Sequence, residues 1–258
     1  MTVLSPTEVD SFRDQGWFVV HDVFTPAECD DIVGHVERAA FELALGKPDD
    51  GQLSYRPMMH LTSPELEAVA TDARWAPIVR PLLGEANGAR LYWEQAVAKP
   101  PHALTELPWH QDNGYTPLIP EEYVTCWLAL DDADERNGCI RVLPGTHVNG
   151  TLQHHNGADG SPFRVGYDGS DEGVAVPVRR GSVLVFSSLL LHRSGPNTTD
   201  RQRRAWIIQF CPAGARSALS GKLLDDRLLV ADHNGWLDQP IRQREIDLVA
   251  MLANYDNR

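Results

Sequence analysis

The chain has 258 residues, of which 42% are hydrophobic, and a formal net charge of −13. This charge argues against nucleic acid or an anionic membrane as a partner, because the long-range field of the protein would repel phosphates. No apolar run is long enough to cross a membrane, and the N-terminal residues do not read as a secretion signal. The four cysteines form no C-x-x-C pair, which argues against a structural zinc site or a disulfide framework. We therefore expect a cytoplasmic protein, either a monomer or a homodimer.

Helix signals dominate the first third of the chain. A Ser-Pro pair followed by glutamate predicts a helix over residues 5–15, and WFVV at 17–20 predicts a short strand. Apolar residues at helical spacing predict further helices from residue 26 to about 45 and from about 64 to 83. We expect residues 1 to about 88 to form a helical support.

Short strand-like segments follow from about residue 90. They are rich in β-branched and aromatic residues and are separated by Gly, Pro, Asn and Asp. Helices first and strands later, without alternation, predict an α+β fold, mainly β, around one antiparallel sandwich or barrel. We expect a single domain over 1–258, with its β core at about 89–213 and a C-terminal extension at about 214–258. The polar, glycine-rich segment at 148–173 predicts a functional loop.

The stretch WHQDNGY holds His110 and Asp112 two positions apart. An H-x-D triplet is common by chance in a chain with 10 histidines, so its context must decide its meaning. Residues i and i+2 of a strand face the same side, so this pair could bind one metal ion if the backbone is extended. His35 and Glu37 have the same spacing but lie on an expected helix, where such residues diverge. We interpret that second pair as a solvated helix face.

A third ligand is needed for a 2-His-1-carboxylate iron site. His192 ends an apolar run before a Ser-Gly-Pro-Asn turn, which places it at the end of an expected strand. A hydrogen-bonded rim histidine is the alternative. The arginines of RQRR at 201–204 open the next apolar strand, where a buried guanidinium could hold a carboxylate, such as that of 2-oxoglutarate, with two parallel hydrogen bonds. A turn with solvated cations is the alternative there.

Four blocks in a fixed order resemble one known family: DQGWFVVHDVFTPAECDDI, then WHQD, then WLALDDADERNGCIRVLPGTH, then HRSGPNTTDRQRRAW. Over nearly its whole length the chain resembles the phytanoyl-CoA dioxygenase family of Fe(II)/2-oxoglutarate-dependent oxygenases. The resemblance implies a double-stranded β-helix core (a cupin-like jelly roll) buttressed by helices.

The resemblance also implies roles for individual residues. It makes His110, Asp112 and His192 the Fe(II) ligands and the catalytic centre. It makes Arg203 the anchor of the 2-oxoglutarate carboxylate, with Arg204 as the alternative because a slip of one residue on a strand reverses the face.

Further residues are assigned to the co-substrate pocket by the same resemblance. Ser194 is expected to help bind the carboxylate, and Trp127 and Gln95 are expected to line the pocket. His154 and His155 look like a metal pair, but they lie in the long polar loop. There we expect substrate contact or solvation instead.

The implied activity is O2-dependent oxidation of an unactivated C–H bond of a small molecule, with release of succinate and CO2. Hydroxylation in secondary (natural product) metabolism is the favoured outcome. Epimerisation, desaturation or oxidative cyclisation would use the same iron site. A metabolite-binding β-helix without catalysis and a cupin-type enzyme with another metal are the remaining alternatives.

The substrate pocket is expected to take its walls from residues 47–61, 102–120, 148–173 and the tail after 214. These segments carry large side chains that would suit an apolar or ring-containing molecule, namely Tyr55, Met58, Met59, Trp109, Tyr115, Phe163 and Trp236.

Overall fold

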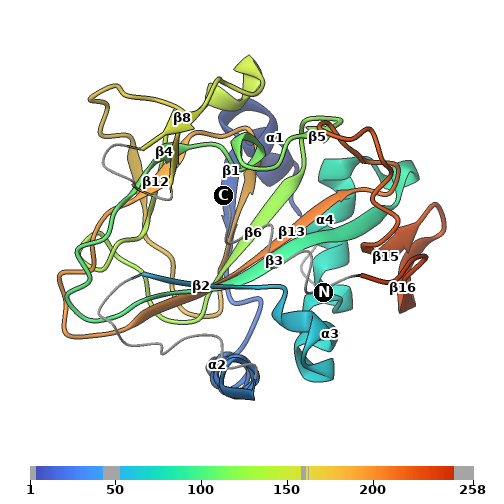
Figure 1. Cartoon of the computed structure of the whole chain (residues 1–258), viewed down its shortest axis with the longest axis horizontal. Helices are drawn as coiled ribbons and strands as arrows, with labels where there is room; N and C mark the ends of the chain where they lie inside the picture. Colours follow the sequence, from blue (N-terminus) through green and yellow to red (C-terminus); the bar gives the residue numbers. More distant parts are fainter. Residues whose placement is uncertain (1–3, 43–52, 158–160, 162, 247–258) are drawn as a thin grey trace.

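The computed structural model describes residues 4–42, 53–157, 161 and 163–246 (Figure 1). The end of the helix predicted over 26–45 lies outside these residues. The α-helices are α1 (Pro6–Gln15), α2 (Pro26–Glu42), α3 (Pro64–Ala70) and α4 (Ala76–Leu83). Short 3-10 helices are η1 (Met59–Leu61), η2 (Ala73–Trp75), η3 (Glu85–Asn87), η4 (Asp112–Gly114) and η5 (Thr146–Asn149).

Most strands belong to two antiparallel sheets. The major sheet has the order β1-β11-β6-β13-β3-β15-β16, and β2 also pairs with β3. Its strands are β1 (Trp17–Val20), β2 (Ser54–Pro57), β3 (Ala89–Lys99), β6 (Val124–Ala129), β11 (Val183–Ser187), β13 (Arg203–Pro212), β15 (Leu228–Asp232) and β16 (Gly235–Ile241). The minor sheet has the order β10-β7-β12-β4, with strands β4 (Leu107–His110), β7 (Ile140–Val142), β10 (Val174–Val176) and β12 (His192–Ser194).

Two small ribbons complete the strands. The first pairs β5 (Leu118–Ile119) with β14 (Arg216–Ser217), and the second pairs β8 (His155–Asn156) with β9 (Arg164–Val165). The two main sheets form the double-stranded β-helix that the sequence predicted. In Figure 1 the minor-sheet strands β4 and β12 lie at the left and α3 and α4 at the right, with β6, β13 and β3 between them.

Along the central strands, successive side chains alternate between two hydrophobic cores. On β6, Val124, Cys126 and Leu128 pack in the cluster that the helices cover. Trp127 and Ala129 of the same strand pack in the cluster between the two sheets. Side chains of successive strand residues point to opposite faces, so every second residue of the major sheet faces the interior of the β-helix. This inner face carries the site described below.

Helix boundaries follow from local sequence signals. A capping box at Ser5 and Glu8 starts α1, and Gly16 ends it in the left-handed conformation at φ 85°. The segment predicted as helical over 64–83 is helical in three pieces, α3, η2 and α4. The side chain of Asp72 accepts the N–H of Arg74 and so starts a new turn. Pro77 lies in the first turn of α4, where a missing N–H is tolerated.

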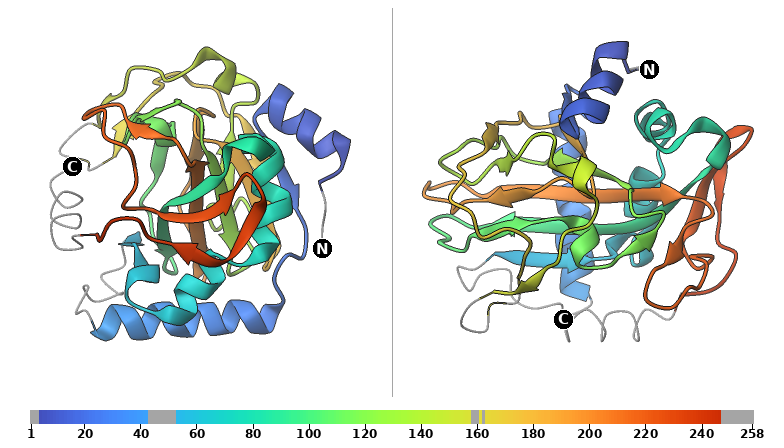
Figure 2. Two further views of the ribbon diagram at one scale, coloured as in Figure 1. Left: turned by 90° about the vertical axis from the view of Figure 1, so that its right-hand side faces the viewer. Right: turned by 90° about the horizontal axis from the view of Figure 1, so that it is seen from above.

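The C-terminal strands extend the major sheet. β15 pairs with β3 and β16 pairs with β15, so this hairpin forms the edge beyond β3. The right-hand view of Figure 2 shows the hairpin in red at one end of the molecule. None of the helices in the described residues has the length and apolar character needed to cross a membrane.

Candidate metal and co-substrate site

The structure brings His110, Asp112 and His192 together. His110 ends β4 and pairs with His192 at the start of β12. Gln111 is extended (φ −114°, ψ 140°) before Asp112 opens η4, so His110 and Asp112 project to the same side. Oδ1 of Asp112 lies 3.6 Å from Nε2 of His192 and 4.0 Å from Nε2 of His110. Each residue thus offers one ligand atom, and these atoms all lie within 4.8 Å of one another.

Both histidines turn the nitrogen with the free lone pair toward this centre. Nδ1 of His110 donates to the carbonyl of Pro108 at 2.8 Å, and Nδ1 of His192 donates to the carbonyl of Leu190 at 3.0 Å. Because a carbonyl only accepts, Nδ1 carries the proton and Nε2 is free to bind a metal. Burial, and then the neighbouring His192, lower the pKa of His110 well below its usual value. His110 is therefore neutral, as a metal ligand must be.

Two residues that the sequence analysis missed orient the carboxylate. Oδ2 of Asp112 accepts from Oγ1 of Thr125 at 2.6 Å and from Nε2 of Gln209 at 2.9 Å. Thr125 on β6 and Gln209 on β13 are directly paired neighbours. With Oδ2 held in this way, Oδ1 is left to face the histidines. The sequence did carry a signal for both residues, because each is a polar residue at an inward-facing position of a largely apolar strand.

The donor set fits a non-haem iron centre. Two neutral imidazoles and one carboxylate are the ligands of the 2-His-1-carboxylate triad, which favours Fe(II) and leaves coordination positions open. His35 and Glu37 lie on α2, as expected. His35 is 3.9 Å from Glu65 and Glu37 is 3.8 Å from Arg204, so the two side chains have separate partners.

Arg203 and Arg204 point to opposite faces of β13. Arg203 is 1% exposed, and its Nη2 lies 3.3 Å from Oγ of Ser194. Its guanidinium carbon is 5.6 Å from the ring centroid of Trp127, and its Nε has no hydrogen-bond partner among the described residues. Arg204 instead binds Asp131 through Nε at 2.7 Å and Nη2 at 2.8 Å. Arg204 is thus already paired, whereas Arg203 is buried with no carboxylate partner in the described part of the chain.

One cavity joins these groups. It has a volume of about 450 Å³ and lies on the inner face of the β-helix. Burial lowers the pKa of Arg203 to about 10, so the guanidinium in its wall is still charged at neutral pH. All seven site residues taken from the sequence line this cavity: His110, Asp112, His192, Arg203, Ser194, Trp127 and Gln95.

The cavity wall is more apolar than polar, and much of its apolar part is aromatic. Of the side chains expected in the wall, Tyr55, Tyr115 and Phe163 line the cavity. Further apolar lining comes from residues that the sequence analysis did not single out, including Trp93, Phe186 and Ile207 on strands and Tyr123 just before β6.

Four expected wall residues pack elsewhere, which corrects the prediction. Met58 and Met59 are fully buried beside β3, because the backbone N–H of Met58 binds the carbonyl of Glu94. Trp109 is buried beneath the guanidinium of Arg193. Trp236 packs against the helix-side core, where its Nε1 donates to the carbonyl of Thr71. The parts of the expected wall at 47–52, 158–160, 162 and 247–258 lie outside the described residues.

His154, in the long polar loop, contacts the segment that carries His110 and Asp112. We expected substrate contact or solvation, but His154 is 9% exposed, and its Nε2 accepts the backbone N–H of Gln111 at 3.0 Å. The side chain of Gln111 in turn donates to the carbonyl of Gly150 and accepts the N–H of Leu152. The residue between the two ligands therefore holds the start of the loop. His155 is exposed and lies 2.8 Å from Asp168.

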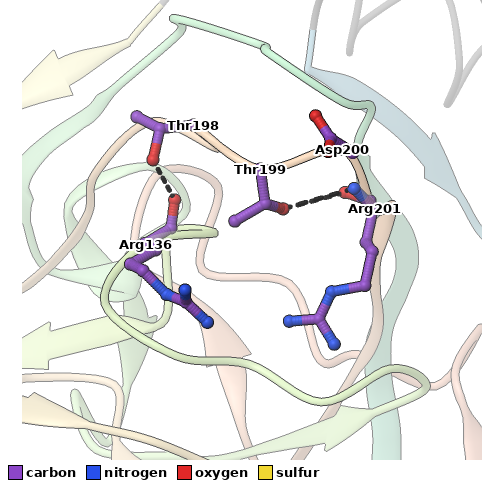
Figure 3. Close-up of a pocket in the computed structure, with 5 residues that line it drawn as sticks. All are labelled: Arg136, Thr198, Thr199, Asp200 and Arg201. Atoms are coloured by element: carbon purple, nitrogen blue, oxygen red, sulfur yellow. Dashed lines mark hydrogen bonds between the residues drawn. The ribbon is translucent and has the colours of Figure 1, made fainter.

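A second, open pocket lies on the surface. It is lined by five residues from two loops, which Figure 3 shows: Arg136, Thr198, Thr199, Asp200 and Arg201. Oγ1 of Thr198 donates to the carbonyl of Arg136 at 2.8 Å. None of these residues lines the cavity that contains the triad. We assign this pocket no part in the site.

The sequence profile described as "Phytanoyl-CoA dioxygenase (PhyH)" matches residues 12–205. The peroxisomal phytanoyl-CoA dioxygenase of Mus musculus is 35% identical over 125 residues, which are 44% of this chain and 37% of that protein. The match thus spans less than two fifths of the length of that relative.

Solved structures match over most of the chain. The 2-oxoglutarate complex of EvdO2 from Micromonospora carbonacea var. aurantiaca has a TM-score of 0.70 at 24% identity, covering 86% of this chain and 96% of EvdO2. The carbocyclase SnoK from nogalamycin biosynthesis, described as non-haem and α-ketoglutarate-dependent, has a TM-score of 0.69 at 26% identity. That match covers 83% of this chain and 86% of SnoK.

Proposed function

Because the chain belongs to the phytanoyl-CoA dioxygenase family, we propose that it is a non-haem oxygenase that uses Fe(II), 2-oxoglutarate and O2. One observation carries the proposal. A triad of two buried histidines and the half-buried Asp112 lines the same cavity as a buried arginine, which has no carboxylate partner among the described residues. A facial triad leaves coordination positions open for a chelating co-substrate, and an unpaired buried guanidinium requires an anion.

Each residue of the site has a distinct part in this proposal. His110, His192 and Asp112 would hold Fe(II), through two Nε2 atoms and Oδ1. Bound there, the iron supplies the oxidising chemistry by which O2 and 2-oxoglutarate give succinate, CO2 and an oxidised C–H bond. Thr125 and Gln209 fix the rotation of the Asp112 carboxylate through its other oxygen.

The remaining polar groups would bind the co-substrate. Arg203 would hold the far carboxylate of 2-oxoglutarate with two hydrogen bonds. Oγ of Ser194 accepts from Nη2 of Arg203 and donates to the carbonyl of Gly138, and it would add a third bond by turning its hydroxyl toward the carboxylate. Trp127 supports the guanidinium from one side. The amide of Gln95, which also lines the cavity, would face the co-substrate. Arg203 is 1% exposed and Ser194 is 2% exposed, so a carboxylate bound beside them would be screened from water.

The substrate would be a small, mostly apolar molecule that contains a ring. The cavity of about 450 Å³ has to hold both 2-oxoglutarate and the reacting part of the substrate. Beyond the co-substrate end, its wall is formed largely by aromatic and aliphatic side chains, which favour such a molecule. Hydroxylation in natural product metabolism is the outcome that we propose. The likeness to the carbocyclase SnoK makes oxidative cyclisation the second candidate.

The proposal is tested by anaerobic titration of the purified protein with Fe(II) and 2-oxoglutarate. We expect the visible charge-transfer absorption typical of an iron–2-oxoglutarate complex. His192→Ala should abolish it, because it removes a ligand. Arg203→Ala should raise the 2-oxoglutarate concentration needed by roughly 10- to 100-fold, since a hydrogen bond to a charged group contributes about 1.5–3 kcal/mol.

Arg204→Ala is the matched control. It removes the neighbouring guanidinium, which faces Asp131 and not the cavity, so the titration should match that of the parent. A folded, metal-loaded parent that gives no absorption with 2-oxoglutarate would contradict the proposal. The two alternatives, a metabolite-binding β-helix without catalysis and a cupin-type enzyme with another metal, would then take its place.

A further inference from the structure

A second basic side chain is buried beside Arg203. Lys99 is the last residue of β3 and pairs directly with Arg203 of β13. Lys99 is 0% exposed, and both residues line the cavity that contains the triad. Paired residues on neighbouring strands project to the same face, and like charges placed in this way are destabilising. Two basic side chains at this position therefore require an explanation.

The hydrogen bonds of Lys99 leave its charge without a counterion. Its Nζ donates to the carbonyls of Thr105 at 3.1 Å and Ser194 at 3.2 Å, and also to the carbonyl of Gly195. These three acceptors match the three N–H groups of an ammonium. No carboxylate lies within ion-pair distance of either Lys99 or Arg203 in the described residues. Carbonyl dipoles alone leave a costly buried charge, which an anion at this end of the cavity would relieve.

The hydrogen bonds from the Lys99 side chain to backbone carbonyls also hold part of the co-substrate site in place. Lys99 binds the carbonyl of Ser194, and Oγ of the same serine lies 3.3 Å from Nη2 of Arg203. The ammonium thus fixes the segment that carries this hydroxyl. It also ties the residues after β12 to the loop after β3 through Thr105 and Gly195.

We propose that Lys99 is a second cationic residue of the dicarboxylate site, which positions Ser194 beneath Arg203 and couples 2-oxoglutarate binding to the uptake of a proton. This inference rests on the proposed function, because 2-oxoglutarate is the dianion concerned. The positive potential of the Lys99–Arg203 pair favours a ligand whose carboxylate faces these two side chains on the cavity side of β3 and β13.

The charged and titratable groups around Lys99 give the direction of the pH effect. Arg203 on β13 faces it, with Glu106 on the loop after β3 and Cys139 just before β7. Burial, and then Arg203, lower the pKa of Lys99 to about 6. A bound carboxylate stabilises the ammonium and raises this pKa. At a pH between the free and bound values the protein takes up a proton on binding, so affinity falls as pH rises above about 6.

Calorimetric titration tests the inference on the whole chain. Protein loaded with Fe(II) under anaerobic conditions is titrated with 2-oxoglutarate from about pH 6.5 to 8.5, in buffers with different heats of ionisation. The parent should take up part of a proton, and its affinity should fall several-fold across this range. Lys99→Met should bind roughly tenfold more weakly at the lower pH, without the proton uptake. Lys222→Met, which changes an exposed lysine, should behave as the parent does.

The outcomes separate this inference from the proposed function. If 2-oxoglutarate binds the parent without proton uptake, or if folded Lys99→Met binds it equally well, the role of Lys99 is overturned while the oxygenase proposal stands. If the folded, metal-loaded parent does not bind 2-oxoglutarate, both are overturned. The parent measurement needs no variant, so poor folding of Lys99→Met cannot leave the question undecided.

Discussion

The carboxylate of Asp112 illustrates how single residues define this site. One oxygen faces the two histidines, while the other is held by Thr125 and Gln209 on neighbouring strands. Such supporting hydrogen bonds keep a ligand in the rotamer that binds the metal. An aspartate without them would have to be ordered by the metal itself, at a cost in affinity.

Thr125→Val should therefore weaken Fe(II) binding by roughly 10- to 100-fold, the usual cost of removing a residue that supports a metal ligand. The substitution keeps the shape of the side chain but removes the Oγ–H donor. Anaerobic metal titration of the apoprotein measures the effect. Thr71→Val is the control, because that hydroxyl donates to the carbonyl of Glu67 in α3. Equal metal affinity in parent and Thr125→Val would refute the supporting role.

At the residue scale, the sequence predicted the metal ligands but not the two residues that hold the Asp112 carboxylate, Thr125 and Gln209. His110 and Asp112 stood out as a motif, and Arg203 was preferred to Arg204 by a resemblance. Strand alternation now gives the physical reason for the preference: odd positions at the start of β13 face the cavity, and Arg204 faces Asp131. The supports could not be paired from the sequence, because Thr125 and Gln209 meet only through the register of β6 and β13.

Among the elements, the loop that begins at residue 150 is the one linked most directly to the ligands. His154 accepts the N–H of Gln111, and the Gln111 side chain binds residues 150 and 152. His154→Ala would leave a buried N–H without an acceptor, at a cost of about 1–3 kcal/mol. We expect faster hydrogen exchange at residues 110–114 and 150–157, with less change in β6. His155→Ala, at the exposed neighbour, is the control. Unaltered exchange in His154→Ala would contradict this link.

The same contact predicts a pH dependence. Burial lowers the pKa of His154 in the folded protein, and its Nε2 accepts a hydrogen bond, so the folded state requires the neutral ring. The stabilisation is fully present above the ordinary histidine pKa of about 6.5 and is lost as pH falls toward the lower, folded value. Hydrogen exchange over 150–157, corrected for intrinsic rates, should therefore increase on acidification below about pH 6.5 in the parent but not in His154→Ala.

Elements were predicted best where the local sequence determines them. The capping box of α1 and the β-branched runs of β6 and β11 are local signals, and each forms the expected element. The hairpin β15–β16 was overlooked inside the C-terminal extension, although Asn234-Gly235 is a strong hairpin signal. Wall residues such as Met58 and Trp236 were misplaced because burial against a distant element leaves no mark on hydrophobic residues in the sequence.

At the scale of the whole molecule, ligand binding should raise the free energy of unfolding. The triad joins β4 to β12, and the co-substrate end joins β3 to β13, so ligands that need these pairings bind only the folded state. At a free ligand concentration of 100 times Kd the expected stabilisation is about 2.7 kcal/mol. For a chain of this size this raises Tm by roughly 5–10 °C. Anaerobic differential scanning calorimetry with Fe(II) and 2-oxoglutarate measures the shift, which His192→Ala should largely lose.

The central place of β13 has a consequence for synthesis of the protein. β13 lies between β6 and β3 in the sheet, yet Arg203 follows its partner Lys99 by about a hundred residues. At roughly 5–20 residues per second, a ribosome needs on the order of 5–20 s between these two strands. During that time β3 and β6 have open, hydrogen-bonding edges that face each other with nothing between them. A nascent chain stalled just before β13 should therefore be the form most prone to aggregation and the one most dependent on chaperones.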